Sequence, residues 1–439
     1  MAWQEEYQRK LVNIEDAAKV IKSGDIVFMS AGPSCPIDVV TAVSARYLEL
    51  ENVNMASGLL MHPFEYLKGE YKGHITHSSG FLGPLERMFM SQGNIRVRPY
   101  QFSKLPRVIP NREYQVAIFE VSPPDDNGFM SFGPVGTFSN AIIARYVKKI
   151  IVQVNRHTPF VNGMEAHIHV GQVDYICEKD HDLVQIPDMA MGPEEEAIAK
   201  HIVERIPDKS CIQLGFGKIA NAVGFYLEGK KDLGVHSEML TNSMMTLAEK
   251  GVITGAYKTY QPGLMACSFG TGTRQLYDFM HRNPMVATFP IYQICDPATI
   301  AKIDNFMSIN NALCVDLMGQ VGSESIGFTM YSGTGGQLDF VRGTAQSKGG
   351  KSFIALRSTA ETKGGLVSRI NTALPLGTIV TTPRTDVQYV VTEYGIADLS
   401  DCSLSQSANA LIAIAHPQFR DQLTQEAKKA GNQDVVGSR

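Results

Sequence analysis

The stretch Cys211-Ile-Gln-Leu-Gly-Phe-Gly-Lys-Ile-Ala-Asn-Ala-Val223 decides the fold class. Its first four residues form a short apolar run that is typical of a buried strand, and apolar residues at helical spacing continue from Ile219 to Leu227. Gly215 and Gly217 stand between the two patterns, where the chain must turn. A strand, a glycine turn and a helix in this order predict one step of an α/β fold.

The same alternation continues in both directions from this segment. We predict strands at Ile26–Met29, Val116–Val121, Ile150–Val154, Cys211–Leu214, Phe353–Leu356 and Val387–Val391, and helices at Glu15–Ser23, Pro36–Tyr47, Pro193–Glu204 and Ile219–Leu227. Strands that alternate with helices favour parallel sheets that are covered on both faces. The expected fold class is therefore α/β with largely parallel sheets.

A faint internal repeat divides the chain in two. Ser23–Gly32 resembles Pro207–Gly217, because in both a polar turn leads into a strand, a loop of small residues and a helix. A second short strand follows each helix, at Val53–Ala56 and at Leu233–His236. Gly192-Pro193, followed by three glutamates, indicates a helix start at a domain junction. The junction predicts domains at 1–190 and 191–439, and if the repeat is a duplication these are two similar open α/β domains that face one another. A cleft between two domains is a common place for a site.

Composition excludes several classes of partner and location. The 439 residues carry 40 basic and 44 acidic side chains, a net charge of −4, which disfavours a nucleic-acid or membrane surface as the main partner. The N-terminus is charged without an apolar run behind it, and no stretch approaches the roughly 18 apolar residues of a membrane span. The seven cysteines are scattered without a Cys-x-x-Cys pair. We expect a cytoplasmic protein without disulfides or structural zinc.

The glycine turn is suited to hold an anion. Glycines let the backbone bring its N–H groups close to a ligand, and the following helix adds unpaired N–H donors and a partial positive charge. Three interpretations stay open on the residues alone. The turn can bind a phosphate or a developing oxyanion. Gly215-x-Gly217-x-x-Ala220, with Glu238 about 20 residues on, also fits a dinucleotide fingerprint. It can also be a plain strand–turn–helix corner.

Two glutamates follow predicted strands. Glu238 ends Asp232-Leu-Gly-Val-His-Ser-Glu238, and a polar residue at the carboxyl end of an α/β strand points into the crevice where ligands bind. A helix is expected after it, up to a stop at Lys250-Gly251. Glu393 follows the strand at Val387–Val391, and we interpret it as a structural acid or one that lines the site. On pattern alone, either residue can be a solvated surface group.

Five segments of the chain resemble blocks of a known family: Leu214–Val223, Leu233–Met239, Ser332–Gly343, Thr381–Ala397 and Ala410–Pro417. On these blocks the chain resembles the acetyl-CoA hydrolase/transferase family, and within it the branch of the 4-hydroxybutyrate CoA-transferases and butyryl-CoA:acetate CoA-transferases. The resemblance extends over nearly the whole chain, and it implies two related α/β domains with the active site in the cleft between them.

The resemblance implies a CoA-transferase in which Glu238 is the catalytic nucleophile and forms a glutamyl-CoA thioester. It places the CoA contacts at Gln213, Leu214, Gly215, Phe216, Gly217, Asn310, Leu313, Gly335 and Gly336. The backbone amides of Gly215 and Gly217 would stabilise the oxyanion. Carboxylates are already ionised at neutral pH, so this chemistry requires no metal and no general base. We expect no permanently bound cofactor, CoA as a co-substrate, short-chain carboxylates as partners, and a homo-oligomer.

Other functions stay open. An acyl-CoA hydrolase would use the same glutamate and differ only in admitting water, while an NAD(P)-dependent dehydrogenase would use the fingerprint. A CoA-binding protein without activity is a further alternative. Among other conspicuous residues, we interpret His167 and His169 as non-metal residues of one strand face and His416-Pro417 as the end of a helix. Lys348 and Lys351 either meet CoA phosphates or are solvated.

Overall fold

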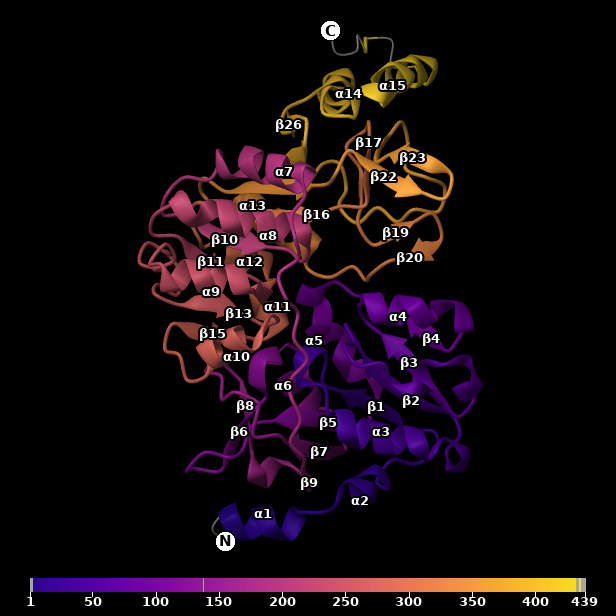
Figure 1. Cartoon of the computed structure of the whole chain (residues 1–439), viewed down its shortest axis with the longest axis vertical. Coiled ribbons are helices and arrows are strands. Elements are labelled where there is room, and N and C mark those ends of the chain that lie inside the picture. Colours follow the sequence, from indigo (N-terminus) through magenta and orange to yellow (C-terminus); the bar gives the residue numbers. More distant parts are fainter. Residues whose placement is uncertain (1–2, 137, 432–433, 436–439) are drawn as a thin grey trace. The chain divides into compact units, whose positions relative to one another are not determined.

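The computed structural model describes residues 3–136, 138–431 and 434–435 (Figure 1). The chain forms two compact units. Unit 1 contains Met1–Pro187, Glu238–Asn242 and Leu264–Ile294, and unit 2 contains Asp188–Ser237, Ser243–Gly263 and Cys295–Arg439. Unit 1 is thus built from three separate segments of the chain. The expected domain boundary between residues 190 and 191 stays a prediction.

A parallel sheet forms the centre of unit 1. Its strand order is β4-β3-β2-β1-β5-β7-β9, from β1 (Ile26–Met29), β2 (Val53–Ser57), β3 (Ile75–Ser79), β4 (Ile95–Val97), β5 (Val116–Val121), β7 (Lys149–Val154) and β9 (Tyr175–Glu178). Every pairing in it is parallel. The order reverses between β1 and β5, which is a switch point of the kind where open α/β sheets place ligands at the carboxyl ends of strands.

Short strand pairs complete unit 1. β6 (Phe129–Ser131) runs antiparallel to β8 (His167–His169). β12 (Met239–Leu240) pairs in parallel with β14 (Phe269–Gly270), and β13 (Met265–Cys267) pairs in parallel with β15 (Val286–Thr288). The segment directly after Glu238 is therefore a strand that is hydrogen-bonded to a neighbour.

Unit 2 contains a second, largely parallel sheet. Its strands lie in the order β11 (Gly234–His236), β10 (Cys211–Leu214), β16 (Phe306–Asn311), β21 (Lys351–Ala355), β25 (Tyr389–Thr392) and β26 (Gly395–Asp398). Only the last pairing among these strands is antiparallel. Unit 2 also contains a three-stranded sheet in the order β18 (Val321–Gly322), β17 (Cys314–Asp316) and β24 (Ile370–Asn371). Two further strand pairs are β19 (Ser325–Ile326) with β20 (Thr329–Met330), and β22 (Thr359–Thr362) with β23 (Gly365–Ser368).

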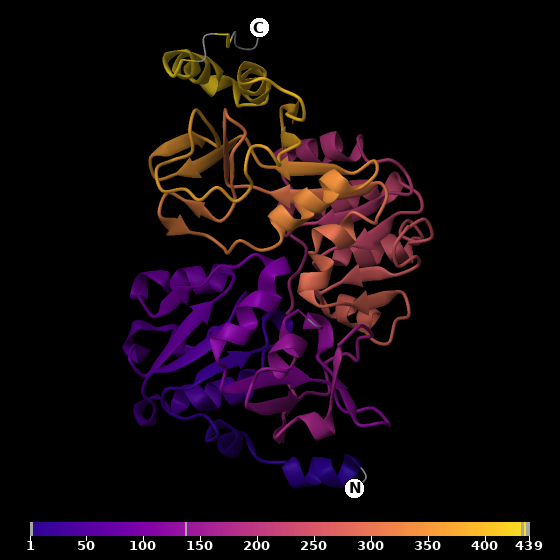
Figure 2. The same cartoon turned by 180° about the vertical axis from the view of Figure 1, so that it is seen from behind.

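Helices cover both faces of the unit 2 sheet. α7 (Pro193–Val203) and α8 (Lys218–Tyr226) pack side by side over one face, and α12 (Pro297–Ile300) and α13 (Gln337–Gln346) over the other (Figures 1 and 2). The other helices are α1 (Trp3–Lys10), α2 (Ile14–Ala18), α3 (Ile37–Ala45), α4 (Pro84–Phe89), α5 (Leu105–Val108), α6 (Asn140–Ala144), α9 (Asn242–Glu249), α10 (Arg274–Met280), α11 (Ile291–Ile294), α14 (Leu404–Ala413) and α15 (Pro417–Lys429). Within the described part of the chain, none is long and apolar enough to cross a membrane.

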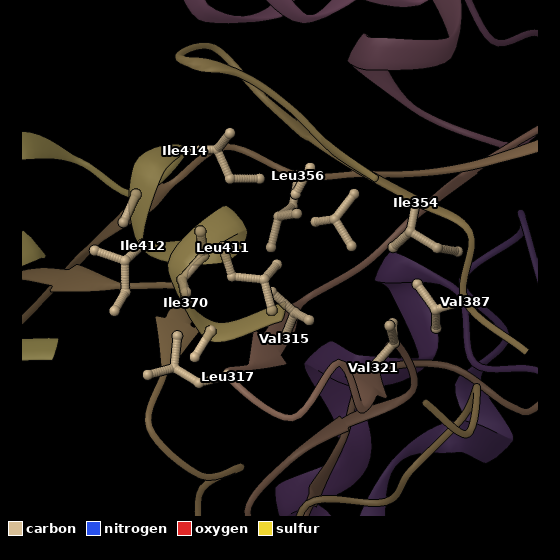
Figure 3. Packing of buried hydrophobic residues seen from close by; sticks show 14 of the residues in the cluster. Val315, Leu317, Val321, Ile354, Leu356, Ile370, Val387, Leu411, Ile412 and Ile414 are labelled. Atoms are coloured by element: carbon tan, nitrogen blue, oxygen red, sulfur yellow. The ribbon is translucent and has the colours of Figure 1, made fainter. Parts of the chain in front are cut away.

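An apolar core fixes the smaller strands of unit 2. Val315, Ile354, Ile370 and Leu411 are fully buried in one cluster, which joins β17, β21 and β24 to α14 (Figure 3). Burying a side chain of this size contributes roughly 1.5–3 kcal/mol. The backbone beside Ile370 is therefore held firmly.

The expected α/β class with largely parallel sheets is confirmed. The strands at β1, β5, β7 and β10 lie where the apolar runs predict them, and both copies of the repeat contain a strand, a helix and a second parallel strand. Several details differ. The helix expected at Glu15–Ser23 ends at Ala18, and the helix expected at Pro36–Tyr47 ends at Ala45. The strand expected at Phe353–Leu356 spans Lys351–Ala355, and the strand expected at Val387–Val391 begins at Tyr389. His416 does not end a helix but caps the start of α15, because its ring nitrogen accepts the Gln418 N–H.

Candidate active site

The glycine corner between β10 and α8 belongs to unit 2. Gly217 is the N-cap of α8 and has a φ of 119°, which a residue with a side chain rarely adopts. The backbone N–H of Gly215 donates to the Ile309 carbonyl at 2.9 Å. This donor is therefore used within the sheet, whereas Gly217 stands at the helix start, where N–H groups lack helical partners.

Asn311 clamps this corner, and the sequence analysis did not single it out. Its Nδ2 donates to the Phe216 carbonyl at 2.6 Å. Because the carbonyl and N–H of one trans peptide point in opposite directions, this bond directs the Gly217 N–H away from Asn311. Asn311 Oδ1 is buried and has no hydrogen-bond partner among the described residues.

A buried polar network lies directly beneath the corner. Gln213 and Ser308 are register partners on β10 and β16, and Asn310 follows on the same face of β16. Gln213 Oε1 accepts from Ser308 Oγ at 2.8 Å and from Asn310 Nδ2 at 3.2 Å, and its Nε2 donates to Asn310 Oδ1 at 3.3 Å. The two predicted amides are thus bonded to one another and join the two strands. Ser308 is a further member that the sequence did not indicate.

The other predicted CoA contacts also lie in unit 2. Leu214 is buried on β10, and the Leu313 N–H donates to the Gly322 carbonyl at 2.9 Å. Gly335 has a φ of 64°, and Gly336 is the N-cap of α13. A buried acid supports this second glycine loop: Glu324 accepts from Thr334 Oγ1 and from Thr381 Oγ1, each at 3.1 Å.

Glu238 is presented from a buried segment of the chain. It follows β11, and the carbonyl of Glu238 accepts the N–H groups of Ser268 at 2.9 Å and Phe269 at 3.1 Å. Within 233–242 it is the only residue that is not buried. The main chain is therefore fixed, while the residue as a whole is partly exposed.

The carboxylate of Glu393 forms hydrogen bonds with a neighbouring loop. Its two carboxylate oxygens accept the Ser358 N–H, at 2.9 Å, and the Ser358 hydroxyl. Both bonds join the segment after β25 to the segment after β21. This arrangement agrees with the interpretation of Glu393 as a structural acid.

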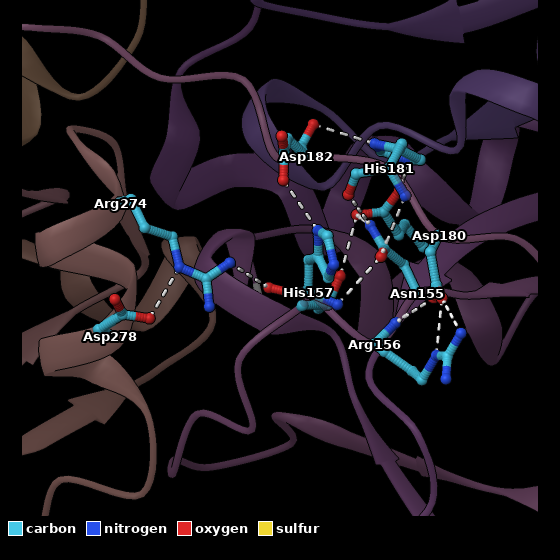
Figure 4. Close-up of polar contacts among 10 residues, drawn as sticks. Asn155, Arg156, His157, Asp180, His181, Asp182, Arg274 and Asp278 are labelled. Carbon is cyan, nitrogen blue, oxygen red and sulfur yellow. Dashed lines mark hydrogen bonds and ion pairs between the residues drawn. The ribbon is translucent and has the colours of Figure 1, made fainter.

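Unit 1 holds a charged cluster that the sequence analysis missed (Figure 4). Glu120, fully buried at the end of β5, accepts from His181 Nε2 at 2.6 Å and from Thr158 Oγ1 at 3.0 Å. Burial by itself lowers the pKa of His181, but its hydrogen bond to Glu120 and the charge of that carboxylate raise it to about 9. Burial also raises the pKa of Glu120, against the effect of these bonds. We interpret the two as a charged pair at neutral pH.

The remaining conspicuous residues lie outside these groups. Lys351 Nζ donates to the Arg205 carbonyl at 3.0 Å, and Lys348 is exposed. His167 and His169 lie on β8 as expected, and each ring bonds a backbone carbonyl, of Val161 and Asn127 respectively. Within the described residues, no group of three or more His, Cys, Asp or Glu side chains could hold a metal ion.

Comparison with known proteins identifies the family. The model of the acetyl-CoA hydrolase/transferase N-terminal domain matches residues 1–187, and that of the C-terminal domain matches residues 272–427. The chain is 41% identical over 441 residues to the butyryl-CoA:acetate CoA-transferase of Anaerostipes caccae, covering 98% of each chain. It is 41% identical over 434 residues to the 4-hydroxybutyrate coenzyme A transferase of Clostridium kluyveri, covering 98% of this chain and 100% of that one.

A solved structure agrees with these relatives. The crystal structure of RipA from Yersinia pestis superposes with a TM-score of 0.92 at 34% identity, covering 98% of this chain and 100% of that one. Both halves of the family and nearly the full length are therefore matched. The chain belongs to the acetyl-CoA hydrolase/transferase family, and it is an enzyme of the CoA-transferase type.

Proposed function

We propose that the enzyme moves CoA between short-chain carboxylic acids by a ping-pong mechanism, through a glutamyl-CoA thioester on Glu238. The acid pair proposed is 4-hydroxybutyrate or butyrate with acetate, since relatives that are 41% identical carry these names. The observation that supports the mechanism is that Glu238 is partly exposed while all its neighbours in 233–242 are buried. A nucleophile requires a fixed backbone and a side chain that the substrate can reach.

The chemistry proceeds by two exchanges at the Glu238 carboxylate. The carboxylate attacks the acyl-CoA thioester, which gives a mixed anhydride and CoA thiolate. The thiolate then attacks the glutamyl carbonyl, which leaves glutamyl-CoA and the free acid. A second acid repeats the sequence in reverse, so each hard transfer is divided into easier steps. No proton transfer is needed, because the acids react as carboxylates.

Each step passes through an oxyanion that needs hydrogen-bond donors. We assign this role to the Gly217 N–H rather than to Gly215, since the Gly215 N–H already donates to Ile309. Removing one such donor typically costs on the order of 10²–10³ in rate. Asn311 supports the assignment, because its bond to the Phe216 carbonyl sets the direction of the Gly217 N–H.

CoA is proposed to lie along unit 2, at Gln213–Gly217, Asn310, Leu313, Gly335 and Gly336. The hydrogen-bonded amides of Gln213 and Asn310 support a positioning role for these two side chains beneath the loop. The positive φ of Gly335 and the helix start at Gly336 suit a close approach by a ligand. We propose a cytoplasmic location, consistent with seven free cysteines, and a homo-oligomeric assembly.

The acid pair is tested by incubating the purified enzyme with acetyl-CoA and a panel of acids, and by identifying the new acyl-CoA by mass spectrometry. The proposal predicts butyryl-CoA or 4-hydroxybutyryl-CoA, with acetate released in equal amount. If acetate and free CoA appear and no new acyl-CoA forms with any acid, the transfer proposal is wrong and hydrolysis is the activity.

A further inference from the structure

Arg369 in unit 2 is an arginine whose side chain has no direct partner among the described residues. Its side chain is partly buried, and it forms no hydrogen bond or ion pair with any described residue. Every other partly buried arginine of the described chain has a partner, namely Ala18 and Glu49 for Arg46, Leu82 for Arg87, Tyr100 for Arg112, Glu195 for Arg357 and Ala415 for Arg420. A guanidinium withdrawn from water without a partner is costly, so the exception calls for an explanation.

The neighbouring charges make no direct contact with this guanidinium. Glu393 attracts Arg369 at a distance, but no hydrogen bond or ion pair joins the two side chains, and the Glu393 oxygens accept from Ser358. Arg357, which repels Arg369, holds Glu195 at 2.6 Å. Burial raises the pKa of the Cys314 thiol to about 11, so this group stays neutral at physiological pH.

The backbone holds Arg369 in a fixed place. Its N–H donates to the Ser358 carbonyl at 2.8 Å, and its carbonyl accepts the Val315 N–H at 2.9 Å. The next residue, Ile370, is fully buried in the core cluster (Figure 3). Arg369 itself is a bend between β23 and β24. The backbone at the base of the Arg369 side chain is therefore held in place by the fold.

The position adjoins the segment assigned to CoA. β24 pairs in parallel with β17, in the register Val315↔Ile370, so Arg369 lies beside Cys314. Leu313, which is a proposed CoA contact, directly precedes Cys314. CoA carries a pyrophosphate and a ribose phosphate, and the chain's net charge of −4 gives no general attraction for such a polyanion. A planar guanidinium fork is well suited to a phosphate.

We propose that Arg369 is a binding residue for a phosphate group of CoA. The inference rests on the proposed function only in taking CoA as the ligand. An anionic ligand at this position would supply the direct partner that the described residues do not. The other source of the same chemistry is the carboxylate of the acid substrate, and the experiment must separate the two.

Equilibrium binding separates them without requiring turnover. Dissociation constants for CoA, pantetheine and butyrate are measured by calorimetry for the wild type, for Arg369→Gln and Arg369→Lys, and for the control Arg342→Gln. Arg342 is an exposed arginine of the same unit that pairs with Asp386 at 3.0 Å. Pantetheine retains the thiol arm of CoA but lacks every phosphate.

The expected result is a CoA affinity about 10- to 100-fold lower for Arg369→Gln, since a charge-assisted bond is lost. Arg369→Lys should be intermediate, because it keeps the charge without the fork. Pantetheine and butyrate should bind all variants within about twofold of the wild type, and Arg342→Gln should match the wild type for every ligand. Equal losses for CoA and pantetheine, a loss confined to butyrate, or no loss at all would each overturn the proposal. A wild type that binds CoA but does not transfer it would contradict the proposed function alone.

Discussion

The side-chain amide of Asn311 donates to the Phe216 carbonyl at 2.6 Å and so fixes the peptide plane that carries the Gly217 N–H. Gly217 itself adopts a φ of 119°, which only glycine accommodates readily. The loop therefore depends on two different properties, a permissive residue and an external clamp. Both are needed, because without the Asn311 bond the peptide between Phe216 and Gly217 could rotate and the Gly217 N–H would lose its direction.

Asn311→Ala should reduce kcat for CoA transfer by about 100-fold, because a misdirected oxyanion donor costs rate at the chemical step. The KM for acyl-CoA should change much less. Asn111→Ala is the matched control, since Asn111 Nδ2 likewise donates to a backbone carbonyl, that of Arg107, but on the surface of unit 1. An Asn311→Ala enzyme with unchanged kcat would mean that the clamp does not serve catalysis.

Ligand stabilisation distinguishes CoA from a dinucleotide at the glycine corner. At a hundredfold excess over Kd, acetyl-CoA or butyryl-CoA should raise the free energy of unfolding by about 2.7 kcal/mol and so raise the melting temperature, whereas NAD and NADP should have no effect. Differential scanning fluorimetry provides the measurement. A shift with NAD and none with any acyl-CoA would favour the fingerprint interpretation of Gly215, Gly217 and Glu238.

Transfer should be far faster than hydrolysis. A transferase must keep water from its glutamyl-CoA thioester until the second acid arrives. Release of free CoA from acetyl-CoA, followed with a thiol reagent, should be at least about 100-fold slower without acceptor than acyl exchange with butyrate. Comparable rates would identify the enzyme as an acyl-CoA hydrolase.

The buried Glu120–His181 pair should make stability depend on pH. The pKa of His181 is raised to about 9, above the roughly 6.5 of an unfolded histidine. The raised pKa of His181 therefore favours the folded state by at most about 3 kcal/mol below about pH 6.5, and this contribution is lost as pH rises through about 9. Denaturant melts at pH 6.5 and 9.5 should show this loss in the wild type and not in His181→Gln.

The exposed pair beside it is the control. His157 Nδ1 lies 2.9 Å from an Asp182 oxygen, but the Asp182 side chain is 87% exposed and that of His157 is 43% exposed (Figure 4). Such pairs contribute little, so His157→Gln should retain the pH dependence of the wild type and lose less than about 1 kcal/mol. Glu120→Gln should instead lose about 3–5 kcal/mol at pH 6.5, because it leaves a buried charge unpaired. If wild type and His181→Gln share the same pH dependence, the assignment to this pair is wrong.

Much of the fold was predictable because its strands are buried on both faces. Val116–Val121 is apolar over most of its length and is fully buried, so composition alone marks it as a central strand. Short strands escaped prediction. β17 and β24 have three and two residues, too few to show a period, and they exist because the core around Ile370 holds them. His416 was misread because a histidine before proline can start a helix as well as end one.

The site was predictable only where local pattern and chemistry coincide. Gly215 and Gly217 carry a signal because glycine between a strand and a helix has few other uses. The connections of Asn311, Glu324, Glu120 and Arg369 span long stretches of sequence, such as the 95 positions from Phe216 to Asn311. The hydrophobic period of a sequence does not predict contacts between residues that are this far apart in the chain. The hydrogen bond from the Gly215 N–H to the Ile309 carbonyl could not be predicted either, because it depends on the register of β10 and β16.

The central claim concerns which glutamate is the nucleophile. Glu238→Gln should abolish transfer with the melting temperature unchanged, and Glu238→Asp should lose at least about 100-fold, because retracting the carboxylate by one methylene destroys alignment. Glu393→Gln is the comparison at a second strand end. It should retain measurable transfer but lower the melting temperature, because Ser358 loses its charged acceptor.

The most direct measurement traps the covalent intermediate. Wild-type enzyme is treated with butyryl-CoA, then with borohydride, which reduces a glutamyl thioester to the alcohol, and is then mapped by peptide mass spectrometry. The account predicts one reduced glutamate, Glu238, in the peptide that contains His236 and Ser237, and no reduction when acyl-CoA is left out. Reduction at Glu393, or a wild-type enzyme that transfers CoA with no reduced glutamate at all, would contradict it.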